Sequence, residues 1–236
     1  MGSGEILSSP FAFYAFYQLF SRLDTSNSKK DATGNVTFDQ IAYELFPGTQ
    51  TDAASEKTSL FITWKKKSKG SSEFQLRGCI GTFAKLPLLR GIEKYALIAA
   101  FEDHRFPPIS AAEVKDLQCS CNVLHEFQSI YAAGKGDIYD WELGVHGIEL
   151  KFRDPHSSRL LSATFLPEVM PEQDWDKRET FVNLIEKAGC WQFAETVMDN
   201  YEKYFVDVIR YRGDKSEISY PEFHRGLKAL LADPSR

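Results

Sequence analysis

Two side chains in this sequence have the chemistry of a nucleophilic or acid–base site, and glycines flank both. Cys79 lies between Gly78 and Gly81, and His146 lies within the segment Gly144–Gly147. A cysteine thiolate is a nucleophile, and imidazole gains or loses a proton near neutral pH. We therefore predict Cys79 as nucleophile or acid, His146 as general base and Glu142 as the group that orients His146. Structural roles for the cysteine and the histidine are the alternative.

The segment Leu76–Phe83 is unusual because it places two glycines inside an expected strand. Glycine weakens a strand, so it is typical of a bulge or of a close approach by a ligand to the backbone. Arg77 would offer a forked donor to a carboxylate or phosphate. A kinked strand with a buried cysteine and a surface arginine explains the same residues, and the spacing leaves both interpretations open.

A further set of residues is predicted to bind a ligand, with Arg77 and Arg105 as clamps for an anion. Arg105 begins Arg105-Phe106-Pro107-Pro108, which is also explained as a structural turn. Trp141 lies in the unusual segment Asp140–Gly147, whereas Trp64-Lys65 is less informative. The predicted ligand-binding residues are Trp64, Lys65, Arg77, Gly78, Gly81, Thr82, Arg105 and Trp141.

No metal site is predicted. Cys119 and Cys121 lack a second Cys or His pair at zinc-like spacing. On an alternating, half-buried strand both thiols would share the apolar face, so core packing is the better account. The sequence does not identify a cofactor, a substrate, a partner or an oligomeric state.

Composition indicates an ordinary folded domain: 236 residues, 43% hydrophobic and 26% charged. The net charge of −5 argues against binding of nucleic acid over a broad basic surface, although a local basic patch is an open alternative. The densest basic run comprises Lys65–Lys67 and Lys69, and a solvated hairpin tip is its expected role. No signal peptide or membrane span is evident, so we expect a reducing compartment, the cytoplasm or the nucleus.

The elements that must position these residues do not alternate as βαβ units, which predicts an α+β fold with mixed or antiparallel sheets flanked by helices. Helices are expected at 10–23, 38–46, 87–103, 176–188 and 219–231, with a further short helix starting at Ser110, and strands are expected at 60–64, 74–83, 117–123, 147–152, 160–165 and 204–211. A loop is expected at 65–72. One domain is expected over 10–225, with terminal extensions at 1–9 and 226–236 and a polar variable insert at 24–57.

Several of these segments together resemble the AMMECR family. The resemblance rests on Leu76–Phe83, on Phe61-Ile62-Thr63-Trp64-Lys65, on Arg105–Pro108, on Trp141–Gly147, and on Thr164–Val169 followed by Trp175-Asp176. It implies a fungal-type member with a larger and a smaller lobe, within a family that is intracellular and often nuclear. In prokaryotes such domains often occur beside a Memo-type domain and a radical SAM enzyme. Roles in transcription, replication, repair or translation have been proposed for the family, without a settled activity.

Two kinds of function fit these residues. The first is an enzyme or small-ligand binder that uses a cleft lined by Cys79, His146 and arginine, acting on a small anion, a nucleotide or a modified RNA base. The second is a non-enzymatic adaptor that recognises a protein or nucleic-acid partner through the same surface, with aromatic and arginine side chains as anchors.

Overall fold

The computed structural model describes residues 9–23, 36–48, 56–68, 70 and 73–232, which form helices and strands of an α+β fold. The chain divides into a larger unit, 1–123 with 214–236, and a smaller unit, 124–213. None of the helices in the described ranges is both long and apolar enough to cross a membrane.

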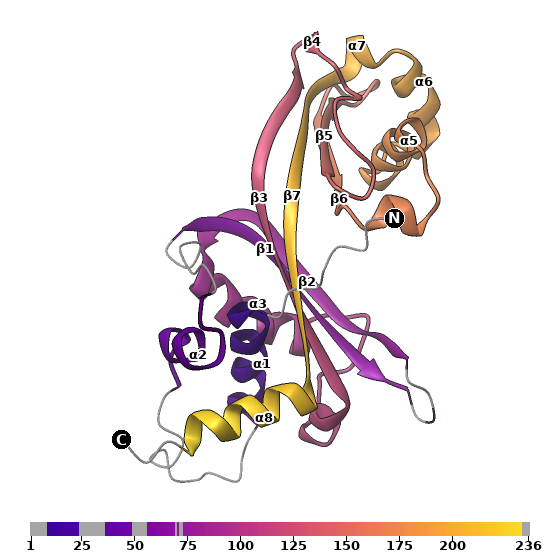
Figure 1. Cartoon of the computed structure of the whole chain (residues 1–236). Coiled ribbons are helices and arrows are strands. Elements are labelled where there is room, and N and C mark those ends of the chain that lie inside the picture. The colour runs from indigo at the N-terminus through magenta and orange to yellow at the C-terminus, as the bar shows by residue number, and fades with distance from the viewer. Residues whose placement is uncertain (1–8, 24–35, 49–55, 69, 71–72, 233–236) are drawn as a thin grey trace. The chain divides into compact units, whose positions relative to one another are not determined.

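Within the described ranges, seven strands pair in the order β2-β1-β3-β7-β5-β6, with β4 paired to β3 (Figure 1). The β1–β2, β3–β4, β5–β6 and β5–β7 pairs are antiparallel. The strands are β1 (Lys57–Lys67), β2 (Phe74–Pro87), β3 (Leu117–Ala132), β4 (Lys135–Gly136), β5 (Gly147–Arg153), β6 (Leu160–Phe165) and β7 (Phe205–Ser219). Because β2 is the first strand in this order, one of its edges has no neighbouring strand. The backbone N–H and C=O groups of Cys79 face this edge, where they bond to Asp103 and Arg105.

The larger unit packs helix α3 (Leu88–Phe101) against β1 and β2, and its other helices gather around them. The other helices are α1 (Pro10–Leu23), α2 (Phe38–Leu45), η2 (Ala111–Asp116) and α8 (Tyr220–Leu231). Helix α3 contacts β1 and β2, and α1 lies against α3 (Figure 1). Phe16 of α1 stacks on Phe223 of α8 and meets Trp64 of β1 edge-on. These rings are fully buried, and they form the centre of the core that supports the Cys79 strand from one side.

The smaller unit packs α5 (Lys177–Lys187) against β5 and β6, with α6 (Ala194–Asp199) beside α5 (Figure 1). The remaining short helices are α4 (Val169–Glu172), η3 (Trp191–Phe193) and α7 (Tyr201–Tyr204). Asp176 caps α5 in a reciprocal capping box with Glu179. Gly189 then ends this segment at φ +94°, a backbone region that glycine adopts without strain.

Most predicted elements are confirmed, but four strands are longer than predicted, including β3, which continues beyond Val123 to Ala132. β1 includes Lys65–Lys67, which had been expected in the hairpin loop, and β2 continues to Pro87. β7 continues beyond Tyr211 to Ser219. Long twisted strands with polar ends carry no strong alternation, so their ends were missed. The short helices α4, η3, α6 and α7 were not predicted.

The burial of β3 differs from the half-buried strand that was predicted. Cys119 and Cys121 are fully buried, as expected for an apolar face, but Ser120 and Asn122 are buried as well. Ser120 keeps its hydroxyl satisfied by donating to Glu217 at 2.7 Å. A polar residue that finds a partner can therefore occupy a buried face, and the alternation of polarity alone misjudged this strand.

The predicted bounds of the domain, 10–225, and of the insert, 24–57, stay predictions, and helices lie across the first bound and inside the second. Helix α8 runs to Leu231 and buries Leu227 and Leu230, so the chain beyond 225 still contributes to the core. Helix α2 lies inside the predicted insert 24–57 and buries Phe38 and Ile41. The rest of that insert lies mostly outside the described residues, as do the first eight residues of the chain.

Candidate functional site around Cys79

Cys79 lies on β2 directly opposite Thr63 of β1. The Thr63 hydroxyl donates a hydrogen bond to Cys79 Sγ at 3.1 Å. Cys79 is half-buried and is not part of a disulfide. A hydroxyl donor beside sulfur stabilises negative charge on it, which is what a nucleophilic thiol requires. Cys119 and Cys121 have a different environment, because they are fully buried and burial raises the pKa of both thiols.

An ion pair holds the backbone of Cys79 at the open edge of β2. The Cys79 N–H donates to Asp103 Oδ2 at 2.9 Å, and Arg105 Nη2 donates to the Cys79 carbonyl at 3.2 Å. Arg105 also forks onto Asp103, with Nε at 2.9 Å and Nη2 at 2.7 Å. Asp103 and Arg105 thus take the place that a neighbouring strand would fill, and they fix Cys79 from the side away from Thr63.

The electrostatics of this pair favour the ionised forms. The hydrogen bonds from Arg105 outweigh burial and, together with the Cys79 N–H, hold the pKa of Asp103 well below its ordinary value. Asp103 is only 5% exposed, whereas the Arg105 side chain is 57% exposed. The guanidinium of Arg105 is therefore accessible to solvent, but it is already paired with the Asp103 carboxylate. An added anion would have to share Arg105 with Asp103.

Arg77, the other predicted anion clamp, is also paired. Its Nε and Nη2 donate to the two oxygens of Glu113 at 3.1 and 3.2 Å, and Lys66 Nζ reaches Glu113 at 2.8 Å. Burial opposes ionisation of Glu113, but the hydrogen bonds from Arg77 and Lys66 outweigh it and lower its pKa to about 2. Arg77 is 8% exposed, so the surface arginine of the structural alternative is wrong for this position.

The two glycines beside Cys79 are explained by packing. A Cβ on Gly78 would lie 2.2 Å from the Ala99 carbonyl oxygen of α3, and a Cβ on Gly81 would lie 2.3 Å from the Phe61 ring. Only glycine permits these approaches. The close approach that their sequence positions predicted is therefore made by the protein itself, and a ligand contact is not needed to account for either residue.

The remaining predicted ligand-binding residues of the larger unit have different surroundings. Trp64 is fully buried and donates from Nε1 to the Ala96 carbonyl at 3.0 Å, so we assign it to the core. Lys65 is partly exposed and forms an ion pair with Glu217 at 3.5 Å. The Thr82 hydroxyl accepts a hydrogen bond from the backbone of Ala84. Of these residues, Lys65 and Thr82 keep surface that a ligand could touch.

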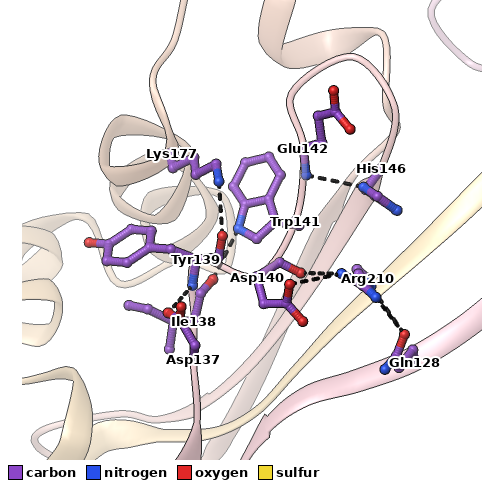
Figure 2. Close-up of polar contacts among 10 residues, drawn as sticks. All are labelled: Gln128, Asp137, Ile138, Tyr139, Asp140, Trp141, Glu142, His146, Lys177 and Arg210. Carbon is purple, nitrogen blue, oxygen red and sulfur yellow. Dashed lines mark hydrogen bonds and ion pairs between the residues drawn. The ribbon is translucent and has the colours of Figure 1, made fainter.

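His146 belongs to the smaller unit, where it ends the turn before β5 (Figure 2). The backbone N–H of Glu142 donates to His146 Nδ1 at 3.1 Å. Neutral His146 therefore carries its proton on Nε2, and in this geometry that nitrogen presents a hydrogen-bond donor. Glu142 orients the ring through its backbone, while its own carboxylate is exposed. The predicted role of general base requires this tautomer to change.

Two arginines and two acidic residues influence the charge of this histidine. Burial, and then the nearby Arg210 and Arg212, lower the pKa of His146. Arg210 Nη1 contacts Asp140, and its Nε and Nη2 reach Gln128 (Figure 2). At neutral pH His146 is therefore an uncharged group beside a fixed arginine.

Trp141 lies next to this segment but is buried. Its Nε1 donates to the Ile138 carbonyl at 3.0 Å, and Lys177 Nζ lies 5.5 Å from the ring centroid (Figure 2). Its edge also meets Phe181 of α5. We assign Trp141 to the core of the smaller unit, where it anchors the segment that carries His146.

The predicted pairing of Cys79 with His146 joins the two units and stays a prediction. Each residue is positioned by contacts inside its own unit: Cys79 by Thr63, Asp103 and Arg105, and His146 by Glu142. The structure brings Cys79 together with Arg105. It also places Arg105 and Arg77 next to the same ring, that of Phe106: Cζ of Arg105 lies 5.6 Å from the ring centroid and Cζ of Arg77 lies 5.9 Å from it. Within the larger unit, these residues form the candidate site.

Comparison with known proteins matches the AMMECR1 family model to residues 25–215, which is most of the chain and includes both Cys79 and His146. The chain belongs to the AMMECR1 family. The matched range begins after α1, although α1 contributes Phe13, Phe16 and Leu19 to the core of the larger unit.

Relatives of this AMMECR1 family member extend over nearly its whole length. The uncharacterized protein YOR289W of Saccharomyces cerevisiae is 54% identical over 95% of this chain and 91% of its own. An uncharacterized protein of Kluyveromyces lactis is 50% identical over 94% of this chain and 96% of its own. The crystal structure of the uncharacterized protein PH0010 from Pyrococcus horikoshii has a TM-score of 0.60 and 24% identity, covering 89% of this chain and 91% of the other. That likeness shows the fold.

Three residues of the candidate site were missed from the sequence: Thr63, Asp103 and Glu113. Asp103 precedes the Arg105–Pro108 corner by two positions, and an acidic residue so near a predicted clamp was a signal that could have found it. Glu113 lies in the short helix that is expected to start at Ser110, and it accepts a hydrogen bond from the Ser110 backbone at 2.9 Å. The ion pair between Glu113 and Arg77 depends on the packing of η2 against the strands, and no pattern in the sequence predicts it.

Proposed function

We propose that this AMMECR1 family member acts on a small molecule through the Cys79 thiol, as an enzyme that uses nucleophilic catalysis. The observation that carries the proposal is the hydrogen bond from the Thr63 hydroxyl to Cys79 Sγ at 3.1 Å. In such a step the sulfur proton passes to a base, Sγ forms a bond to a carbonyl carbon of the substrate, and the electron pair of the broken C=O π bond moves to the carbonyl oxygen. His146 stays the predicted acid–base group, and the proposal for Cys79 does not depend on it.

Rigidity of the cysteine supports the same proposal. Both backbone groups of Cys79 are held by Asp103 and Arg105, and its side chain is held by Thr63. A nucleophile whose position is fixed in advance loses less freedom on reaching the transition state. The same contacts also protect an open sheet edge, which is a purely structural role. Thiol reactivity separates the two roles, because edge protection does not require a reactive sulfur.

Alkylation with iodoacetamide tests the proposal. The folded protein is treated at neutral pH, and the rate of labelling at each cysteine is read by peptide mass spectrometry. We expect Cys79 to react first, and we expect a low-molecular-weight fraction of a yeast extract to protect it in a saturable manner. A Cys79→Ala variant serves as the control for labelling elsewhere. Labelling of Cys79 no faster than that of the fully buried Cys119 would reject the proposal.

A second candidate is a binding module that uses the exposed face of the Arg105–Phe106 corner. The observation that favours it is the 57% exposure of the Arg105 side chain next to Phe106, because arginine and aromatic residues are frequent interface anchors. Arg77 and Trp141 are buried and are poor anchors by comparison. If this function holds, Arg105→Ala abolishes capture of the partner while Cys79→Ser leaves it unchanged. Retained capture by Arg105→Ala would count against the module.

The cellular compartment is also a proposal. We place the protein in the cytoplasm or the nucleus, where its thiols, including the buried Cys119, Cys121 and Cys190, would stay reduced. Fluorescence microscopy of a fusion protein tests this. Signal confined to the secretory pathway would exclude it.

A further inference from the structure

An open hollow of about 980 Å³ lies beside the candidate site, between the ends of β1 and β2 and the short helix η2. Its volume falls at the upper end of the range of ligand pockets in proteins. The lining residues that matter for its chemistry are Lys66, Lys67, Leu76, Arg77, Glu113, Lys115 and Asp116. All of them belong to the larger unit, and Cys79 is not one of them.

Arg77 forms part of the wall and has an unmade hydrogen bond. Its side chain is 10% exposed, and two of its nitrogens are used by Glu113. The third, Nη1, is shielded from solvent and has no hydrogen-bond partner among the described residues. A buried donor without an acceptor costs about 1–3 kcal/mol, so such groups in proteins nearly always have a partner. An acceptor from outside the chain would complete the fork of Arg77.

The charges around the hollow favour an anion as that acceptor. Four of the lining side chains named above are cationic and two are anionic. Glu113 is already engaged by Arg77 and Lys66. Lys67 and Lys115 have no ion pair within the described part of the chain. The hollow is therefore locally positive, although the whole chain has a net charge of −5.

We propose that this hollow binds a small phosphorylated molecule of about the size of a nucleoside monophosphate. Lys67 and Lys115 attract the phosphate, and Arg77 completes its hydrogen bonds through Nη1, since a guanidinium fork matches the oxygens of a phosphate. Because Nη1 is shielded, binding includes a shift of a flexible neighbouring side chain. Leu76, which is 44% exposed, offers apolar surface to the rest of the ligand.

The hollow and the candidate site share Arg77, but neither Cys79 nor Thr63 lines the hollow. Substitution of its lysines leaves the Thr63–Cys79 contact intact, so the rate of Cys79 alkylation reports on the thiol alone. Loss of phosphate binding with unchanged alkylation would identify a failure of the hollow, and the reverse would identify a failure of the thiol.

Isothermal titration calorimetry of the full chain with AMP tests the inference. We expect saturable binding that a Lys67→Glu/Lys115→Glu variant weakens by about tenfold or more. The matched control is Lys57→Glu, at the opposite end of β1, which should bind AMP as the original chain does. Lys67 and Lys115 are both exposed, so circular dichroism of the test variant should show an unchanged fold.

A second variant addresses Arg77 itself. Arg77→Lys keeps the charge beside Glu113 but removes the fork, and we expect weaker AMP binding by a similar factor. Three results would overturn the inference: no AMP binding up to about 5 mM, equal binding of citrate, or equal loss of affinity in Lys57→Glu. Binding of a ten-residue oligothymidine without binding of AMP would also reject it, in favour of a nucleic-acid surface.

Discussion

The backbone N–H of Cys79 donates a hydrogen bond of 2.9 Å to Asp103, a residue 24 positions further along the chain. The same carboxylate accepts two hydrogen bonds from the Arg105 guanidinium and one from the Arg105 backbone N–H, and the guanidinium in turn donates to the Cys79 carbonyl. One buried carboxylate therefore fixes the strand edge that carries the candidate nucleophile, and its removal should disturb the stability of the fold and the position of the thiol together.

Asp103→Asn should lower the free energy of unfolding by about 1–3 kcal/mol at pH 7, because a charge-assisted network around a buried group is weakened. Urea denaturation measures this. The exposed neighbour Glu102→Gln is the matched control and should change stability by less than about 0.5 kcal/mol. An Asp103→Asn protein as stable as the original would show that the ion pair contributes nothing at the β2 edge.

The stability from Asp103 should also depend on pH. Its folded pKa is depressed, so its contribution is complete above the unfolded value of about 4 and is lost as the pH falls below that value toward the folded pKa. The stability difference between the original chain and Asp103→Asn should therefore shrink between about pH 5 and pH 2. A difference that stays constant over this window would contradict the assignment.

Thr63→Val should slow alkylation of Cys79 by about fivefold, the equivalent of about 1 kcal/mol, because it removes the hydroxyl donor while keeping the shape of the side chain. Iodoacetamide labelling followed by peptide mass spectrometry gives the rate. Thr63→Ser retains the hydroxyl and should react nearly as fast as the original chain. Equal rates in the valine and serine variants would mean that the Thr63 contact does not tune the sulfur.

Gly78→Ala should destabilise the protein by about 3 kcal/mol, because the added Cβ meets the Ala99 carbonyl oxygen, a backbone atom that cannot rotate away. Gly48→Ala is the comparison: Gly48 has open space around it and only a positive φ of 83°, so about 1 kcal/mol is expected. Thermal and urea unfolding measure both. Similar losses for the two variants would show that α3 can move away from β2.

His146 should titrate below the ordinary histidine value of about 6.5, because burial and the two nearby arginines disfavour its charged form. NMR of its Cε1–H signal gives the midpoint, and Arg210→Gln should move that midpoint upward. Since the unfolded chain takes up this proton first, stability should fall as the pH drops below about 6.5, and His146→Gln should lack this part of the pH dependence. A midpoint at or above 6.5 would contradict the geometry.

Much of the local structure follows from residues close together in the chain. Ser219 and Glu222 form a reciprocal cap at the start of α8, and Asp176 and Glu179 do the same for α5. These caps join positions three residues apart, so their geometry needs no information from the rest of the fold. For the same reason the unusual glycine-flanked segments around Cys79 and His146 could be singled out from the sequence, and so could the family resemblance, which the family match confirms.

Only the tertiary structure decided what surrounds those segments. The partners of Cys79 are Thr63, Asp103 and Arg105, and Glu113 is the partner of Arg77; strand register and the packing of α3 and η2 bring these residues together. Trp64, predicted to meet a ligand, points into the core because the pleat of β1 directs it toward α1 and α3. Side-chain types are written in the sequence, whereas contacts between distant residues depend on how the strands pair and which face each side chain takes.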